Sequence, residues 1–426
     1  MPPSPLPLHR AAGAMRALAS RGLRATWLGI GPMSDTVIEA ALRLAGERRF
    51  PLLFIASRNQ VDSAEFGSGY VRGWDQAAFA AAVRGMAGRL GFDGLCYLCR
   101  DHGGPWQRDR ERGDRLPAGE AMEIAGRSLE ADLEAGFDLL HVDPTKDPHA
   151  GETVPLDTVL RRTVDLVARA EDTRRRRGLP EVAYEVGTEE TSGGLTSEEA
   201  FAGFAERLAG ALGARGLPPP AYIVGQTGTL TRLTENVGRF NPAAARRLSA
   251  IALRHGMGLK EHNGDYLPDA TLALHPGLGV AAVNVAPEFG VAETAAWLAL
   301  AEAEDGLAAQ GLVARPSSLA EALRAGSVRS ERWRKWMTGD DVRRPVEDVL
   351  GDARLSDLIA RVGGHYAFDL PEVRARREAL EANLGACGLR PRRFVVDALK
   401  RSMGRYVDCL NLEGVTDLVR AECGAA

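Results

Sequence analysis

The stretch Gly94-Leu95-Cys96-Tyr97-Leu98-Cys99-Arg100-Asp101-His102 holds the pattern that decides the fold. A short apolar run ends in polar or acidic residues, and the loop that follows leads into an amphipathic helix. The same arrangement occurs eight times. The predicted strands cover residues 24–30, 51–56, 94–99, 137–143, 181–187, 220–225, 257–262 and 280–286. Strands that are each followed by a helix favour parallel pairing, because a parallel crossover needs about a dozen residues or more. The sequence therefore predicts an α/β protein built on a closed (β/α)8 barrel, the TIM barrel.

The chain is longer than such a barrel requires. Its 426 residues exceed the roughly 250 residues of a bare barrel. We expect the barrel over residues 1–300 and a helical C-terminal extension over residues 301–426 that packs on it. The second region shows amphipathic helices and no strand signal.

Charge and composition exclude several classes of protein. The net charge of −4 argues against a nucleic-acid surface, which normally carries a basic excess. No run of 18 uninterrupted apolar residues is present, so no membrane span is expected. The five cysteines show no disulfide framework, which favours a reducing compartment, and we expect a cytoplasmic protein. No nucleotide-binding glycine loop and no G-x-S-x-G hydrolase elbow is found.

Histidines and carboxylates gather at the ends of several predicted strands, where a barrel places its chemistry. Asp101 and His102 follow the third strand. Because neighbouring strand residues point to opposite sides, we expect one of them to face the barrel axis and the other the loop. His102 and His262, together with Glu189 or Glu190, form a set that suits a divalent metal with open positions. The alternative is a rim of separate hydrogen-bonded polar groups.

Three aspartates are candidate catalytic groups. Asp101 can donate or accept a proton. His141 and Asp143 alternate on the fourth strand and share a face. Asp143 is a candidate active-site carboxylate, whereas His141, one layer deeper, fits a hydrogen-bonded core histidine equally well. Asp265 is expected either to orient His262 or to bind a sugar hydroxyl.

Long loops after the strands offer residues for substrate binding. Amide side chains suit the hydroxyls of a polyol and serve equally well as loop caps; those in question are Asn59, Gln60, Gln226 and Asn284. Gly193 and Gly194 can let a phosphate approach backbone N–H groups. The loop with Trp106 and the segment His365-Tyr366 are candidate lids over a site.

A group of short motifs is spread over nearly the whole chain. They are Ser57-Arg58-Asn59-Gln60-Val61, Asp101-His102-Gly103-Gly104-Pro105-Trp106, His141-Val142-Asp143, Gly187-Thr188-Glu189 with Gly193-Gly194, Gln226 with Gly228, Glu261-His262-Asn263-Gly264-Asp265-Tyr266, Leu355-Ser356-Asp357 and His365-Tyr366. As a group they resemble the accessory, non-catalytic subunit family of class II D-tagatose-1,6-bisphosphate aldolase. That family also includes ketose and ketose-phosphate 4-epimerases.

The resemblance implies a TIM barrel related to zinc-dependent class II aldolases. Asp101 and His102 then match the Asp-His pair of the aldolases, and His262 matches their metal histidine on strand seven. Where the classical aldolases have a further histidine, this chain has Glu189 or Glu190. The third ligand and the metal are therefore open: zinc is expected, with manganese, nickel or cobalt as alternatives.

The end of the last strand departs from the same family. The stretch Asn284-Val285-Ala286-Pro287-Glu288-Phe289-Gly290 stands where the accessory subunits have a lysine-containing version. This difference implies a changed substrate end of the site, with Asn284 and Glu288 as candidate contacts. The sugar need not be derived from tagatose.

The sequence therefore predicts a metal-dependent epimerase that inverts C4 of a ketose or ketose phosphate by retro-aldol and aldol steps. Asp101 or Asp143 would remove the proton of the C4 hydroxyl. Two alternatives stay open. One is a non-catalytic subunit that stabilises the catalytic subunit of a class II aldolase, and the other is an aldolase itself. The sequence leaves the oligomeric state open, a homo-oligomer included.

Overall fold

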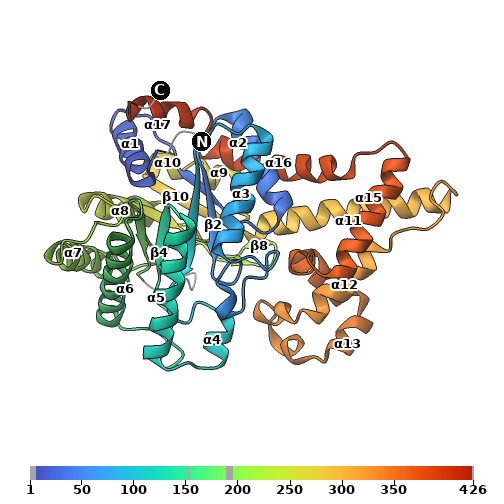
Figure 1. Ribbon diagram of the computed structural model, residues 1–426, viewed down its shortest axis with the longest axis horizontal. Helices are drawn as coiled ribbons and strands as arrows, with labels where there is room; N and C mark the ends of the chain where they lie inside the picture. The colour runs from blue at the N-terminus through green and yellow to red at the C-terminus, as the bar shows by residue number, and fades with distance from the viewer. Residues whose placement is uncertain (1–5, 152, 189–194, 425–426) are drawn as a thin grey trace.

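The protein forms a closed barrel of eight parallel strands surrounded by helices (Figure 1). The structure, a computed structural model, describes residues 6–151, 153–188 and 195–424. The barrel strands are β1 (Trp27–Ile30), β2 (Leu52–Ser57), β3 (Cys96–Gly103), β4 (Leu139–Val142), β5 (Ala183–Val186), β6 (Tyr222–Val224), β9 (Gly258–Glu261) and β10 (Val280–Val285). They pair in the order β1-β10-β9-β6-β5-β4-β3-β2, and β1 also pairs with β2, which closes the ring. The predicted (β/α)8 barrel is confirmed.

The predicted strands agree with the observed ones, and β3 differs most. Each predicted range overlaps one observed strand. β3 continues to Gly103, past its predicted end at residue 99, so that Asp101 and His102 lie within the strand. A small antiparallel hairpin, β7 (Thr231–Arg232) with β8 (Glu235–Asn236), stands in a loop where no strand was predicted.

Helices alternate with the strands and form the outer layer of the barrel, and further helices build the C-terminal region. Their bounds are α1 (Leu8–Ser20), α2 (Asp35–Arg48), α3 (Gln76–Leu90), α4 (Asp109–Gly113), α5 (Ala118–Ala135), α6 (Leu156–Arg177), α7 (Glu198–Ala214), α8 (Pro242–Arg254), α9 (Asp269–Leu272), α10 (His275–Leu278), α11 (Pro287–Ala309), α12 (Leu319–Arg329), α13 (Val346–Gly351), α14 (Ala353–Gly363), α15 (Pro371–Ala386), α16 (Pro391–Cys409) and α17 (Val415–Glu422). Ser34 accepts the backbone N–H of Val37, and Asn241 accepts that of Ala244, each at 3.0 Å. Both side chains satisfy a donor that the first helical turn leaves without a partner. Of the helices described, none is long and apolar enough to cross a membrane.

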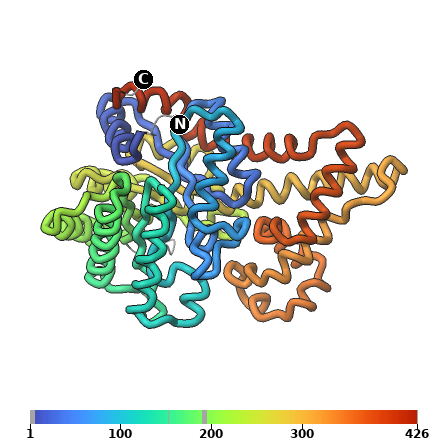
Figure 2. The backbone as a smooth tube through the Cα atoms, in the orientation of Figure 1, coloured from blue at the N-terminus to red at the C-terminus, as the bar shows by residue number. Residues whose placement is uncertain are grey.

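The C-terminal region is joined to the barrel by a continuous helix rather than by a linker. α11 runs across position 300, where the sequence analysis placed the end of the barrel. α16 then packs against α11 and α2, and α17 packs against α1 (Figure 2). One hydrophobic core serves both regions, since it contains Trp27 and Phe54 of the barrel together with Leu399 and Tyr406 of α16.

A second, smaller core lies in the tail. It is formed by Val328, Trp333, Val349, Leu355 and Ile359. These residues belong to α12, α13, α14 and a short 3-10 turn at Arg332–Lys335. This part of the tail, drawn in orange in Figure 1, lies to one side of the barrel.

Candidate metal centre at the mouth of the barrel

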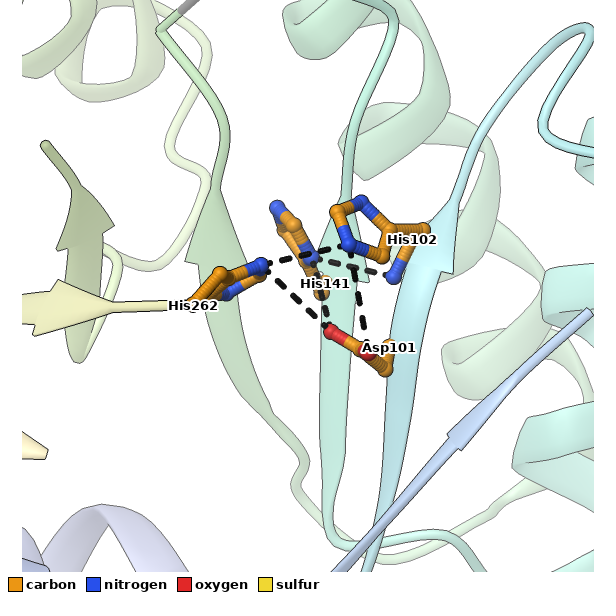
Figure 3. Close-up of side chains that lie close together, drawn as sticks. All are labelled: Asp101, His102, His141 and His262. Carbon is orange, nitrogen blue, oxygen red and sulfur yellow. Dashed lines mark hydrogen bonds and ion pairs between the residues drawn. The ribbon is translucent and has the colours of Figure 1, made fainter. Parts of the chain in front are cut away.

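Four titratable side chains meet at the C-terminal ends of the barrel strands (Figure 3). Asp101 and His102 come from the end of β3, His141 comes from β4, and His262 directly follows β9. One nitrogen or oxygen atom of each residue lies within 4.8 Å of the corresponding atoms of the other three. This end of the strands is where (β/α)8 enzymes carry their chemistry. We call these four residues the His/Asp cluster.

Asp101 and His102 both face the cluster, although they are neighbours in one strand (Figure 3). The pairing of β3 with β4 shifts register between Arg100 and Gly103, and His102 has a φ of 48°, in the left-handed region. Bulges of this kind re-aim side chains at strand ends. A Cβ at position 103 would lie 2.7 Å from the carbonyl oxygen of His141, so only glycine fits there. The expectation that Asp101 and His102 point to opposite sides is therefore wrong, because alternation requires a regular pleat.

A second carboxylate holds His102 in place. Its Nδ1 lies 2.5 Å from Oδ2 of Asp143, whose Oδ1 accepts the hydroxyl of Thr145 at 2.5 Å. Burial alone would lower the pKa of His102, but the charge of Asp101 and the hydrogen bond to Asp143 outweigh it and raise the pKa to about 9. In the neutral ring the Asp143 contact keeps the proton on Nδ1. The lone pair of Nε2 then faces the cluster, 3.3 Å from Nδ1 of His262.

His262 is held in the same way by an acid deeper in the barrel. Its Nε2 lies 2.6 Å from Oε1 of Glu185 on β5, and Oε2 of Glu185 accepts a hydrogen bond from Nζ of Lys260 at 2.5 Å. Glu185 and Lys260 are almost completely buried. Burial would raise the pKa of Glu185, but the Lys260 ammonium outweighs it and lowers the pKa to about 2. Glu185 is thus an ionised acceptor that fixes the orientation of His262.

His141 completes the cluster from β4. Its Nδ1 accepts the backbone N–H of His102 at 3.1 Å and lies 3.7 Å from Oδ1 of Asp101. The side chain is 1% exposed, and its Nε2 has no hydrogen-bond partner among the described residues. A histidine that only fills the core would have both nitrogens satisfied. The period of two on β4, which puts His141 and Asp143 on one face, was the signal in the sequence for this position.

The spacing of the cluster suits a divalent metal ion. Imidazoles bind Zn²⁺ at about 2.0–2.1 Å in tetrahedral geometry, which places ligand atoms about 3.4 Å apart. The cluster has a pair at 3.3 Å and contacts from Asp101 to its histidines at 3.7 and 3.9 Å. In two of the three imidazoles, the ring nitrogen that points away from the cluster donates its N–H to a carboxylate, as metal-binding histidines commonly do. The donor set therefore fits a cation.

The expected ligand from strand five does not lie within the described residues. Glu189, Glu190, Gly193 and Gly194 all fall outside the ranges that the structure describes. In the described part of that strand, the acid nearest the cluster is Glu185. Sequence reasoning missed Glu185 because it lies inside an apolar run rather than at its end.

A cleft of about 530 Å³ opens above the cluster. Asp101, His102 and His262 line its floor, with Asp265 and Asn284 beside them. Asn284 donates its Nδ2 to Oδ1 of Asp101 at 3.2 Å, and its own Oδ1 has no hydrogen-bond partner among the described residues. The barrel thus presents carboxylates, imidazoles and an amide to one space.

The tail forms the opposite wall of this cleft. Lys335, Trp336, His365 and Tyr366 line it, so the predicted pair His365-Tyr366 does lie over the cluster. Neither ring nitrogen of His365 has a hydrogen-bond partner among the residues described, although the side chain is buried. Arg332 lies 5.1 Å from the ring centroid of Tyr366.

Three other expected contacts, Trp106, Asn59 and Gln60, make hydrogen bonds to the loops around the cleft instead. Trp106 is fully buried and donates its indole N–H to the carbonyl of Leu116 at 2.9 Å. Asn59 donates to the carbonyl of Gln107, and Gln60 accepts the backbone N–H of Ser57. Gln226 is buried, and its backbone N–H is accepted by the hydroxyl of Thr196. The side chains of Trp106, Asn59 and Gln60 thus shape the loops that carry the cleft.

Asp265 and Glu288 connect the cleft to the helices behind it. Asp265 accepts the backbone N–H groups of Ala286 and Glu288 at 3.0 and 2.9 Å, and so caps the start of α11. Burial raises the pKa of Asp265 to about 7. Glu288 accepts hydrogen bonds from Tyr406 and Arg405 of α16, which ties the last strand loop to the tail.

Solved structures of several sugar enzymes are similar to this chain. A crystal structure of a probable tagatose 6 phosphate kinase from Sinorhizobium meliloti 1021 has 26% sequence identity and a TM-score of 0.68, covering 94% of this chain and 100% of that one. The fructuronate-tagaturonate epimerase UxaE from Cohnella laeviribosi has 14% identity and a TM-score of 0.55, covering 91% of this chain and 81% of that one. Fructose-bisphosphate aldolase from Campylobacter jejuni has 13% identity and a TM-score of 0.54, covering 96% of each chain. The last two likenesses show the shared fold.

A family model gives the more specific assignment. The model described as D-tagatose-1,6-bisphosphate aldolase subunit GatZ/KbaZ-like matches residues 16–205. This range includes Asp101, His102, His141 and Asp143, and it ends before His262. The match over residues 16–205 confirms the resemblance to this family that the motifs predict.

Proposed function

We propose that the protein is a metal-dependent epimerase that inverts C4 of a ketose or ketose phosphate. The observation that carries the proposal is the convergence of three imidazoles and Asp101, of which Asp101, His102 and His262 line the floor of one cleft. Carbon–carbon cleavage next to a carbonyl needs a group that accepts electrons and a base that removes a hydroxyl proton. The His/Asp cluster offers a place for the first and a carboxylate for the second.

His102 and His262, whose free lone pairs face the cluster, would hold the cation, and His141 is the third imidazole beside them. A divalent ion held there would supply Lewis-acid polarisation of the substrate carbonyl. We expect zinc, and manganese, nickel and cobalt also suit imidazole ligands. Asp143 and Glu185 orient His102 and His262 from behind, so they contribute without facing the cleft.

Asp101 is the base in this proposal, because it lines the cleft whereas Asp143 lies behind His102. Burial would raise the pKa of Asp101, but the nearby charges of His102 and His262 outweigh it and keep the pKa low, so the carboxylate is ionised. Asp101 takes the proton of the C4 hydroxyl, C4–O becomes a carbonyl, and the electron pair of the C3–C4 bond moves into the ketone fragment. The aldehyde turns its other face to C3, the bond re-forms, and Asp101 returns the proton to O4.

The cleft keeps the aldehyde in place between the two steps. A wall from the tail stands over the cluster, with Trp336 and Tyr366 as its apolar surfaces. Asn284 and His365 present unsatisfied polar atoms suited to sugar hydroxyls. An open site would release the aldehyde, and the outcome would be an aldolase reaction.

The test removes the two imidazoles that the carboxylates hold. His102→Ala and His262→Ala should each lose the bound metal and all turnover while keeping the wild-type circular dichroism spectrum. Metal is measured by mass spectrometry, and turnover by NMR detection of the 4-epimer across a panel of ketoses and ketose phosphates. His9→Ala, a partly exposed histidine on α1, is the matched control and should behave as wild type. Full metal loading of both cluster variants would remove the assignment.

A second candidate function follows from the family description, which names an aldolase subunit. In that case the chain stabilises the catalytic subunit of a class II aldolase. Co-purification with such a partner, together with an isolated chain that binds no metal, would favour this role. An aldolase proper would instead release free triose phosphate from a ketose bisphosphate, which a coupled assay detects.

A further inference from the structure

We infer that the opposite end of the barrel holds a second binding site, for a small organic anion with an apolar body. A cavity of about 410 Å³ lies there between α1, α8 and α10. The first residues of several strands line it, among them Trp27 of β1, Tyr222 of β6 and Gly258 of β9. The His/Asp cluster lies at the other ends of the strands, so the proposed reaction makes no use of this cavity.

The charge of the lining is the first argument. All of its charged side chains are arginines: Arg16 on α1, Arg24 before β1, and Arg246 on α8. None of the three forms an ion pair with a carboxylate of the described residues, although the chain as a whole is acidic. Arg16 is half-buried, whereas Arg24 and Arg246 are exposed, and Arg24 donates a hydrogen bond to the carbonyl of Gly277 at 3.1 Å. Three uncompensated cations around one cavity favour an anion.

Most of the remaining lining is apolar, which indicates that the ligand has an apolar body. Met15, Met257 and Leu278 contribute to the wall, and Leu253 at its edge is 60% exposed. An inorganic anion alone would leave this surface in water. A volume of about 410 Å³ falls within the range of about 300–1,000 Å³ typical of small-molecule pockets. The lining therefore suits a molecule with one anionic end and one apolar end.

Two buried polar atoms in the lining give a third, independent argument. Nε1 of Trp27 and Oγ of Ser249 have no hydrogen-bond partner within the described parts of the chain. These side chains are only 1% and 7% exposed. An unsatisfied buried donor costs about 1–3 kcal/mol, and native structures keep few of them. Both side chains line the cavity, so a bound molecule with acceptor oxygens would lie beside them.

The test uses 8-anilinonaphthalene-1-sulfonate as the probe, because it joins a sulfonate to an aromatic body. Fluorescence and calorimetric titration of the folded, full-length protein should show saturable binding of one equivalent. The neutral analogue N-phenyl-1-naphthylamine should bind at least about tenfold more weakly, since it lacks the charge that the arginines recognise. The affinity should be the same in His262→Ala, because that residue lies at the other end of the barrel.

Two substitutions on α8 locate the site. Arg246→Gln should weaken binding of the sulfonate about fivefold or more, whereas Arg247→Gln should change it less than twofold. Arg247 is the neighbouring arginine, pairs with Glu198 and does not line the cavity. Ala250→Trp, at an exposed lining position, should block the cavity and abolish binding while the melting temperature stays near that of wild type. Binding that does not saturate, equal effects of the two glutamine variants, or equal affinity for the neutral probe would each overturn the inference.

Discussion

Asparagine in place of Asp143 should reverse the position of the ring proton on His102. In the wild type, Oδ2 of Asp143 accepts from Nδ1 of His102 at 2.5 Å, which leaves Nε2 free to bind a metal. The asparagine oxygen can still accept the hydroxyl of Thr145, so its NH2 group turns toward Nδ1. The neutral ring then carries its proton on Nε2, the atom that faces the cluster. The variant should keep the fold and lose metal affinity.

The size of this effect follows from the contacts of His102. The hydrogen bond to Asp143 and the charge of Asp101 outweigh burial and raise the pKa of His102 to about 9, so at neutral pH a metal must displace a proton. The wild-type metal affinity should therefore rise about tenfold per pH unit between about pH 7 and 9. Loss of a carboxylate behind a metal histidine costs about 10–100-fold in affinity. In the Asp143→Asn variant the pKa of His102 falls, and the rise above pH 7 should become shallow.

The assay is a competition titration with a coloured chelator at several pH values from about 7 to 9. Asp147→Asn is the matched control, because Asp147 lies on the same loop and pairs with Arg162 rather than with the cluster. The control should keep both the wild-type affinity and its pH dependence. If Asp143→Asn also keeps both, then Asp143 does not set the tautomer of His102, and the reasoning fails.

Three further predictions concern stability. Burial raises the pKa of Glu293 to about 7 from an ordinary 4.5, so this carboxyl should by itself cost the folded protein about 3 kcal/mol of stability as the pH rises from about 4.5 to above 7. Glu293→Gln should remove this share from the pH dependence of thermal unfolding and leave the share of Asp265, whose pKa is raised in the same way; a variant with the wild-type pH dependence would contradict the prediction. Arg58→Met leaves buried carboxylates without their cation and should cost about 3–5 kcal/mol in urea unfolding, whereas the exposed Arg110→Met should cost less than about 1 kcal/mol. Lys260→Met should also lower the free energy of unfolding by about 3–5 kcal/mol, because it leaves the buried Glu185 carboxylate without its cation. In a double-mutant cycle, adding Glu185→Gln should restore much of that loss, whereas additive effects of the two substitutions would argue against the buried pair.

Much of the barrel was predictable from the sequence. Continuous apolar runs separated by amphipathic helices define buried parallel strands, and eight of them close a ring. The positions of His102 and His262 followed directly, because residues at strand ends gather at one mouth. The overlap of every predicted strand with an observed one reflects how strongly burial on both faces constrains composition.

The finer geometry of the cluster was not predictable from spacing alone. Asp101 and His102 face the same way because of a local bulge, and a bulge depends on how β3 fits against β4. His141 and Glu185 are polar residues inside apolar strands, and a sequence does not show whether such a residue meets a partner across the barrel. Lys260 supplies that partner for Glu185 from a strand 75 residues away in sequence.

The sequence did not distinguish whether the loop residues bind a ligand or stabilise the loops. Trp106 stands in a long loop and was a candidate lid residue, yet its indole N–H is hydrogen-bonded within that loop and the ring is buried. Asn59 and Gln60 likewise cap loops. Amides and aromatic rings serve packing and recognition equally well, so only their surroundings distinguish the two uses. His365 and Tyr366 could be placed over the site because they interrupt an otherwise helical region.

The separate small core in the tail has a consequence for how such proteins diversify. Trp336 lines the cleft and also packs against that core, while the His/Asp cluster belongs to the barrel. Substitutions in this part of the tail can therefore change the shape of the cleft without disturbing the His/Asp cluster beneath it. If this part of the tail is exchanged between homologous proteins, we expect the preference for one sugar over another to be transferred with it. The proposed type of reaction should stay unchanged.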